Sequence, residues 1–196
     1  MAPLIALVRL IKISELTCDG QQNFTHFFYI NGWRGINVEA RPGSRERFQT
    51  VRPRDINLEV GVSKEPGSLT YYFISDDSTM NSFSREFLEH IDMLREVKRE
   101  IPVPVIPLSE VLERHLPAGQ SIDFMSVDVE GHDLQALESN DWERFRPRFV
   151  VVEDKEVEAE RSEIVRFMRS QGYAVCAQNV IILDKLNEYF FVDRRA

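Results

Sequence analysis

The densest group of chemically capable side chains in this 196-residue chain is the run Asp128-Val129-Glu130-Gly131-His132. On an extended backbone Asp128 and Glu130 point to the same side, and Gly131 permits a sharp turn into a following helix. An imidazole here can act as a general base near neutral pH, which makes His132 a candidate catalytic residue and the Asp128/Glu130 pair the alternative. The same three side chains could instead hold a divalent cation. A structural role, with a carboxylate capping the helix and His132 merely exposed, accounts for them as well.

A second acidic side chain, Glu39, ends the short strand-like run that starts at Ile36. In an open α/β sheet, ligands bind outside the carboxyl ends of the strands, and a carboxylate there can accept hydrogen bonds from both hydroxyls of a ribose. Glu39 therefore indicates a nucleoside site. The alternative is a solvated strand-end acid paired with Arg34 or Arg41.

A third acidic strand end is formed by Glu153 and Asp154, which follow the apolar run Phe149 to Val152. These two carboxylates either reach the same crevice as Asp128 or are only solvated. Asn81 and Ser82, in a loop after a strand, are more typical of side chains that satisfy turn backbone than of pocket residues.

The elements that must position these groups alternate along the chain between strand-like runs and amphipathic helices. We expect strands near 36–39, 56–60, 68–74, 103–106, 122–129, 149–152, 173–177, 180–183 and 189–192, and helices near 43–50, from 84, from 109, after 131 and from about 158. This alternation predicts an α/β fold with a mostly parallel, buried sheet. Only five residues, 184–188, separate the last two runs, so that pair should be antiparallel. Pro104 favours an edge position for the strand that contains it.

Composition narrows the class of protein further. The length suits a single domain over 1–196, and 24 basic against 32 acidic residues give a net charge of −8, which disfavours binding to nucleic acid or to an anionic membrane. The most apolar stretch, 3–13, is too short to span a bilayer and is expected to be a strand or short helix. Two cysteines make no disulfide framework, and we expect a cytoplasmic protein with both thiols buried.

Several linked blocks of sequence resemble one family, the FkbM-type S-adenosylmethionine-dependent methyltransferases. The blocks occur in order between about residue 23 and about residue 155. They are Phe28-Tyr29, the run Gly32 to Glu39, the run Arg52 to Leu58, Gly61-Val62-Ser63, Ile122-Asp123-Phe124, the run Val127 to His132, Asp141-Trp142 and Arg146-Pro147.

The resemblance implies a class I methyltransferase fold: a Rossmann-like, mostly parallel sheet with helices on both faces and an antiparallel C-terminal strand. It implies the cofactor S-adenosyl-L-methionine and methyl transfer to a hydroxyl of a small metabolite or sugar. The Asp128/Glu130 pair would act directly or through a divalent cation, although no metal ligand is assigned. By position, Glu39 would bind the cofactor ribose. The segment with Asn57, Gly61 and Val62 would lie near the adenine. Asp128, which we also assign to the cofactor, would face the methyl acceptor together with Glu130 and His132.

Residues 1–22 are atypical for this family. The family carries a glycine-rich turn after its first strand, typically Val-Asp-Val-Gly-Ala-Asn, whereas this chain has Ser-Glu-Leu-Thr-Cys-Asp at 14–19 and its nearest glycine at Gly20. Either Asp19-Gly20 forms a displaced turn, or the first strand is lost or replaced. The alternative function is therefore a methyltransferase-fold protein without cofactor binding that acts as an interaction or regulatory domain. A metal-dependent enzyme on the same carboxylates is a third hypothesis, and the sequence does not fix the acceptor or the oligomeric state.

Overall fold

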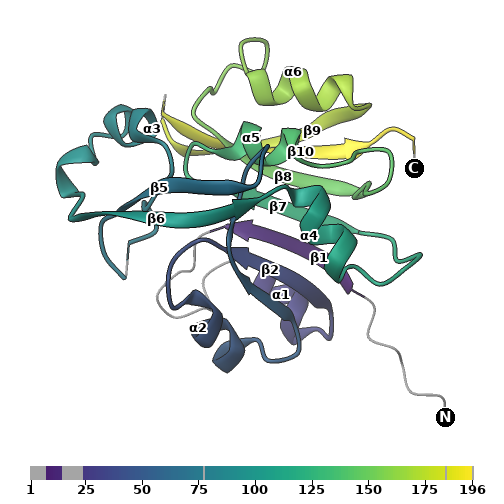
Figure 1. The fold of residues 1–196 in the computed structure, drawn as a ribbon. Helices are drawn as coiled ribbons and strands as arrows, with labels where there is room; N and C mark the ends of the chain where they lie inside the picture. The colour runs from purple at the N-terminus through teal and green to yellow at the C-terminus, as the bar shows by residue number, and fades with distance from the viewer. Residues whose placement is uncertain (1–7, 15–23, 77, 184, 196) are drawn as a thin grey trace.

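The structure is a computed structural model and describes residues 8–14, 24–76, 78–183 and 185–195. Within these residues a seven-stranded sheet has the order β3-β2-β1-β7-β8-β10-β9 (Figure 1). Its strands are β1 (Val8–Ser14), β2 (Arg34–Glu39), β3 (Ile56–Glu59), β7 (Phe124–Asp128), β8 (Phe149–Asp154), β9 (Tyr173–Ile182) and β10 (Leu186–Asp193).

The direction of the strands changes near the C-terminus. The pairs from β3 through β2, β1 and β7 to β8 are parallel, whereas β10 is antiparallel to both β8 and β9. This confirms the expected antiparallel pairing at the end of the chain. The two runs expected at 173–177 and 180–183 form one continuous strand, β9.

A second sheet corrects the expectation of one mostly parallel sheet. It has the order β4-β6-β5, built from β4 (Gly61–Val62), β5 (Gly67–Phe73) and β6 (Arg99–Ile106), and it pairs β4 with β6 in parallel but β5 with β6 antiparallel. Both sheets are therefore mixed. β4 is only two residues long, which is too short to produce a periodic sequence signal.

Pro104 predicted an edge position for β6, and this prediction is wrong, because β6 is the middle strand of its sheet. However, β4 pairs only with Val105 and Ile106 of β6, so Pro102 and Pro104 pair with β5 alone. One side of the proline-containing half therefore needs no backbone donors.

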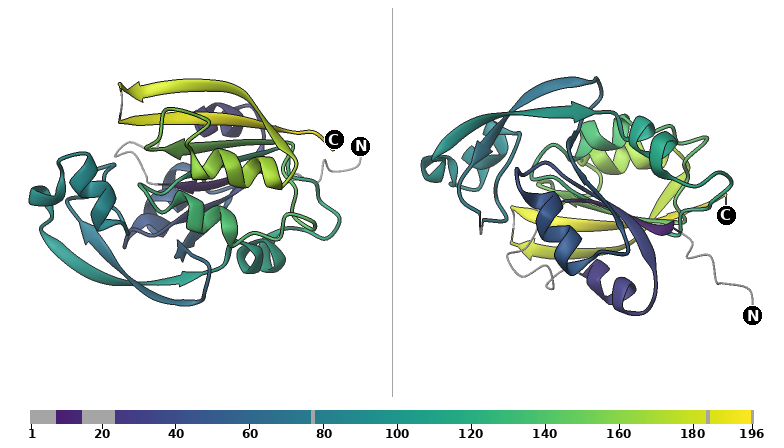
Figure 2. Two further views of the ribbon diagram at one scale, coloured as in Figure 1. Left: turned by 90° about the horizontal axis from the view of Figure 1, so that it is seen from above. Right: turned by 60° about the horizontal axis from the view of Figure 1, so that its bottom comes forward.

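Helices lie on both faces of the large sheet (Figure 2). α1 (Phe24–Ile30) and α2 (Ser44–Val51) are on one face, and α4 (Leu108–His115), α5 (Asp133–Glu138) and α6 (Glu163–Ser170) are on the other. The sequence did not indicate α1. The helix expected from residue 84 ends early: α3 spans Arg85–His90, Asp92 has φ 63°, and a 3₁₀ turn, η1 (Leu94–Glu96), leads to β6.

The core fills the space between the large sheet and these helices. Strand residues Ile11, Val127 and Val150 are each 0–1% exposed, and Leu112 of α4 and Val165 of α6 are 0% exposed. Because β1 lies between β2 and β7, the first strand of the sheet is not lost. The displaced turn expected at Asp19-Gly20 lies outside the described residues.

Two smaller expectations, on the cysteines and on a membrane-spanning segment, also have an outcome. Cys176 is exposed on β9 instead of buried, and Cys18 lies outside the described residues. Over the described part of the chain, none of the helices has the length and apolar character needed to cross a bilayer.

Candidate active site

A small pocket opens at the carboxyl ends of β1, β2 and β7. β1 and β7 are the neighbours from which the strand order runs in opposite directions, which is the switch point where open α/β sheets bind ligands. Residues of both sheets line the pocket: Ile13, Val38, Glu39, Ala40, Val60, Gly61, Val62, Tyr71, Asn81, Phe83 and Val129.

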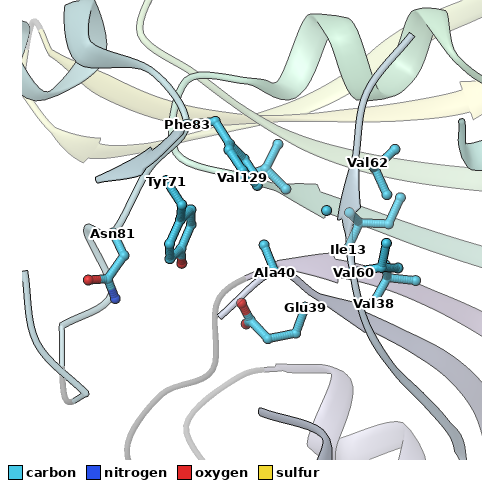
Figure 3. A pocket seen from close by; sticks show the side chains of 11 residues that line it. Ile13, Val38, Glu39, Ala40, Val60, Val62, Tyr71, Asn81, Phe83 and Val129 are labelled. Atoms are coloured by element: carbon cyan, nitrogen blue, oxygen red, sulfur yellow. The ribbon is translucent and has the colours of Figure 1, made fainter. Parts of the chain in front are cut away.

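Glu39 supplies the acidic side chain of this pocket. It is the last residue of β2 and is 2% exposed, and its Oε1 accepts a hydrogen bond from the backbone N–H of Arg41 at 2.9 Å. Figure 3 shows the Glu39 carboxylate on the same side of the pocket as the Tyr71 hydroxyl, across from the aliphatic side chains of Val38, Val60 and Val62. The pocket therefore combines an apolar wall, which suits a nucleobase, with an acid at a strand end, which suits the hydroxyls of a ribose.

Gly61 and Val62 lie in the pocket wall, whereas Asn57 does not. A Cβ on Gly61 would lie 2.6 Å from Cζ of Phe83, so the glycine allows that ring to pack against β4. The Asn57 amide accepts a hydrogen bond from Asn37 Nδ2 at 2.8 Å and donates one to the Arg52 carbonyl at 3.1 Å. Asn57 therefore belongs to a buried polar network that joins β2 and β3.

The acidic ends of β7 and β8 come together. Asp128, Glu130 and Glu153 each offer a carboxylate oxygen, and these oxygens all lie within 4.8 Å of one another. Val127 pairs with Val152, so Asp128 and Glu153 follow directly on two parallel, registered strands. Burial, and next the neighbouring charge of Asp128, raises the pKa of Glu153 well above its usual range.

His132 lies beside this group of carboxylates but is not part of it. Its Nε2 is 3.1 Å from the Ser63 hydroxyl, and its ring centroid is 5.7 Å from that of Phe83, which lines the pocket. Burial lowers the pKa of His132 below its usual value, so the imidazole is neutral and able to accept a proton at neutral pH.

Asp133 fixes the turn between β7 and α5, a role that the sequence did not indicate. Its Oδ1 accepts from the N–H of Val129 at 2.9 Å and its Oδ2 from the N–H of Gly131 at 3.0 Å. The Ser82 hydroxyl donates to the Glu130 carbonyl at 2.5 Å. These bonds hold Glu130 at φ 51° and Gly131 at φ 85°, in the left-handed region that is unusual for a glutamate.

Other residues of the site come from the second sheet. Tyr71 on β5 and Phe83, which follows β5, close one side of the pocket, and the Tyr71 side chain is 2% exposed. No sequence motif indicated either residue. Asn81 also borders the pocket, but its amide bonds to backbone atoms of Ile74, Ser75 and Ser78, which confirms its role in the turn.

A larger pocket, with about 980 Å³ of empty space, lies at the carboxyl end of β8 between α5 and α6. Its lining includes Glu153, Asp154 and Asp133, together with the cationic side chains Arg161 and Arg166. The Asp154 carboxylate accepts from the Ser162 hydroxyl at 2.5 Å and from the N–H of Glu156 at 3.0 Å, so it supports the loop before α6. Glu153 thus lies at the boundary between the acidic strand ends and this second pocket.

An α/β fold with a pocket at the strand switch point and an acid at the end of the second strand places a candidate ligand site where open α/β sheets bind nucleotides and related ligands. The methyltransferase FkbM domain matches residues 16–175. The chain therefore belongs to the FkbM methyltransferase family, as its sequence blocks indicated.

One relative is 31-O-demethyl-FK506 methyltransferase FkbM of Streptomyces tacrolimicus, which is 30% identical over 176 residues. The alignment covers 74% of this chain and 66% of that protein, so it spans slightly less than two thirds of the relative. No solved structure matches the chain.

Proposed function

We propose that this protein is an S-adenosyl-L-methionine-dependent methyltransferase of class I architecture that methylates a hydroxyl of a small molecule. The observation that carries the proposal is the buried Glu39 carboxylate in an otherwise largely apolar pocket at the strand switch point. Membership of the FkbM family and the name of the relative, a methyltransferase for an O-demethyl compound, support the reaction class.

The residues around the smaller pocket fit the nucleoside part of the cofactor. Glu39 would accept hydrogen bonds from the ribose hydroxyls, and Gly61 and Val62 would lie along the adenine. Asn57 has a structural role in this proposal, because its amide is occupied between β2 and β3. When bound, the cofactor supplies an electrophilic methyl group.

The acceptor would enter from the side of the β7 and β8 ends. Its hydroxyl must lose a proton as the new carbon–oxygen bond forms, and the protein must hold that oxygen in line with the methyl group. His132, neutral and beside the pocket wall, is the first candidate for the base, and Asp128 and Glu130 are the alternatives. The larger pocket next to Glu153 offers space for the acceptor.

The test is a titration of the purified protein with S-adenosylhomocysteine, followed by calorimetry and by thermal unfolding. At 100 times its dissociation constant this product should stabilise the fold by about 2.7 kcal/mol. Glu39→Gln should remove most of the binding, because a neutral amide no longer accepts from both ribose hydroxyls.

Glu59→Gln is the matched control for this titration. Glu59 pairs with Glu39 across the β2–β3 ladder and is exposed, and its carboxylate accepts from the N–H groups of Gly43 and Arg45 at the start of α2. It does not line the pocket, so its variant should keep wild-type affinity. Absence of any heat or thermal shift with wild type would instead support a methyltransferase-like domain that does not bind the cofactor.

A further inference from the structure

Parallel pairing brings the acidic ends of β7 and β8 to one point. Asp128 and Glu153 follow the registered pair Val127 and Val152, and residues at equivalent places on adjacent parallel strands point to the same face. Glu130 reaches the same point from the turn after β7. The three carboxylates therefore converge from two strands and one turn, within 4.8 Å of one another.

Glu153 is the member of this group that most needs a positively charged partner. It is 6% exposed, and its Oε1 has no hydrogen-bond partner among the described residues. The charged groups that act on it are all carboxylates, those of Asp128, Asp133, Glu188 and Asp154. A buried carboxylate oxygen without a partner is unfavourable, so this carboxylate must either keep a proton or have a cation beside it.

The backbone at Glu130 is held in place at a cost. A glutamate in the left-handed region is strained and persists only where its surroundings fix it. Here the Ser82 hydroxyl bonds the Glu130 carbonyl, and the Asp133 carboxylate bonds the N–H groups on both sides of Glu130. The turn thus keeps a third carboxylate next to two others, against their mutual repulsion.

We propose that Asp128, Glu130 and Glu153 bind a divalent cation, Mg²⁺, at the carboxyl ends of β7 and β8. The ligand atoms are carboxylate oxygens, which suit a hard cation such as Mg²⁺ or Mn²⁺ and not a thiolate- or imidazole-preferring metal. Mg²⁺ keeps several water ligands, so three protein ligands are sufficient. The cation removes the electrostatic cost of three adjacent carboxylates, of which Glu130 and Glu153 are buried.

This site deepens the proposed function, and the role of the cation beside the methyl acceptor rests on that function. Glu153 also lines the larger pocket, so the cation would lie beside an acceptor bound there. A cation in that position polarises the acceptor oxygen as a Lewis acid and assists loss of its proton.

Cation binding is tested on the full chain, stripped with a chelator, with Mn²⁺ alone as the probe. Electron paramagnetic resonance at about pH 8, where fewer protons compete with the metal than at neutral pH, should show one bound Mn²⁺ that Mg²⁺ displaces. Loss of even an outer-shell partner typically costs about 10- to 100-fold in metal affinity, so Glu153→Gln should weaken Mn²⁺ binding at least about tenfold. Asp128→Asn should do the same.

Glu188→Gln controls for the loss of one negative charge. Glu188 pairs with Glu153 across the β8–β10 ladder but is not among the three converging carboxylates. Its variant should bind Mn²⁺ nearly as wild type does. No bound Mn²⁺ in wild type, or equal binding by wild type and both ligand variants, overturns the proposal and leaves a shared proton as the partner of Glu153.

S-adenosylhomocysteine binding is measured on the same samples, which separates the two proposals. Cofactor binding without Mn²⁺ binding removes the cation site alone. Mn²⁺ binding without cofactor binding keeps the site and removes its role in methyl transfer. If Glu153→Gln does not fold, Asp128→Asn and the wild-type titration still decide the question.

Discussion

The imidazole of His132 and the hydroxyl of Ser63 lie 3.1 Å apart, although 69 positions separate them in the chain. Ser63 follows β4 of the second sheet, and His132 precedes α5 on the large sheet. The contact therefore joins the two sheets at the rim of the smaller pocket. It also fixes the orientation of a ring whose pKa is lowered by burial.

If His132 is the general base, His132→Ala should reduce turnover by about 10²- to 10⁴-fold and leave S-adenosylhomocysteine affinity nearly unchanged. Ser63→Ala, the matched control, removes only the orienting contact and should reduce turnover much less. The measurement is methyl transfer from labelled cofactor after a screen for the acceptor. The acidic limb of the wild-type profile should lie below the usual histidine pKa of about 6.5. Full activity of His132→Ala would exclude this base and make Glu130 the next candidate.

The buried Asp133 makes folding stability depend on pH. Burial, and then repulsion by Asp128, raises the pKa of Asp133 to about 7, against about 3.9 for an aspartate in an unfolded chain. Between these values the folded chain holds a proton that the unfolded chain has released, so its contribution is full below about pH 4 and is lost as pH rises through about 7. Asp133→Asn should flatten this fall.

Urea unfolding of wild type and Asp133→Asn, in the presence of chelator, measures the difference in slope across that pH range. Asp141→Asn is a suitable control, because Asp141 also caps a turn: its carboxylate accepts from the N–H groups of Glu143 and Arg144. Unlike Asp133, Asp141 is only partly buried. Parallel pH profiles for wild type and Asp133→Asn would contradict the assignment.

Gly131 is required by both its backbone and its neighbour. Its φ is 85°, and a Cβ at this position would lie 2.4 Å from Cβ of Phe87. Gly131→Ala should therefore cost more than the roughly 1 kcal/mol expected for a positive φ alone. Gly119→Ala is the control, since Gly119 has φ 74° with no atom within 4 Å of the added Cβ. Equal losses of unfolding free energy in the two variants would show that Phe87 moves aside freely.

The ion pair of Arg146 and Asp193 joins the loop before β8 to the last residue of β10. Asp193 accepts from Arg146 Nε at 2.9 Å and from Nη2 at 2.5 Å, and these bonds lower the pKa of Asp193. Asp193→Asn should cost about 3 kcal/mol at neutral pH, because the partly buried guanidinium loses its charged partner.

The loss in Asp193→Asn should itself depend on pH. A depressed aspartate pKa contributes stability above about pH 4, and that contribution disappears as pH falls through the lower, folded-state value. The difference in unfolding free energy between wild type and variant should therefore shrink in acid. Asp92→Asn, at an exposed ion pair with Lys185, should cost much less. A constant difference at all pH values would exclude the ion pair as its source.

The local pattern of apolar residues was sufficient to find most elements of the large sheet. The runs ending at Glu39, Asp128 and Asp154 are strands, and their acidic ends do lie at the carboxyl edge. Such patterns survive because each strand in a buried sheet must place apolar side chains on its covered faces. The segment 61–106 was less predictable, because a two-residue strand and a proline-containing strand depend on their partners more than on their own composition.

The sequence by itself determined the alternation of strands and helices, the family, and three acidic strand ends with a histidine nearby. Only the tertiary structure decided that Glu153 joins Asp128 and Glu130, that His132 contacts Ser63, and that Tyr71 and Phe83 close the pocket. The reason is physical. Hydrophobic periodicity and turn chemistry act over a few neighbouring residues, whereas the meeting of strand ends follows from strand order and register, which depend on packing between distant parts of the chain.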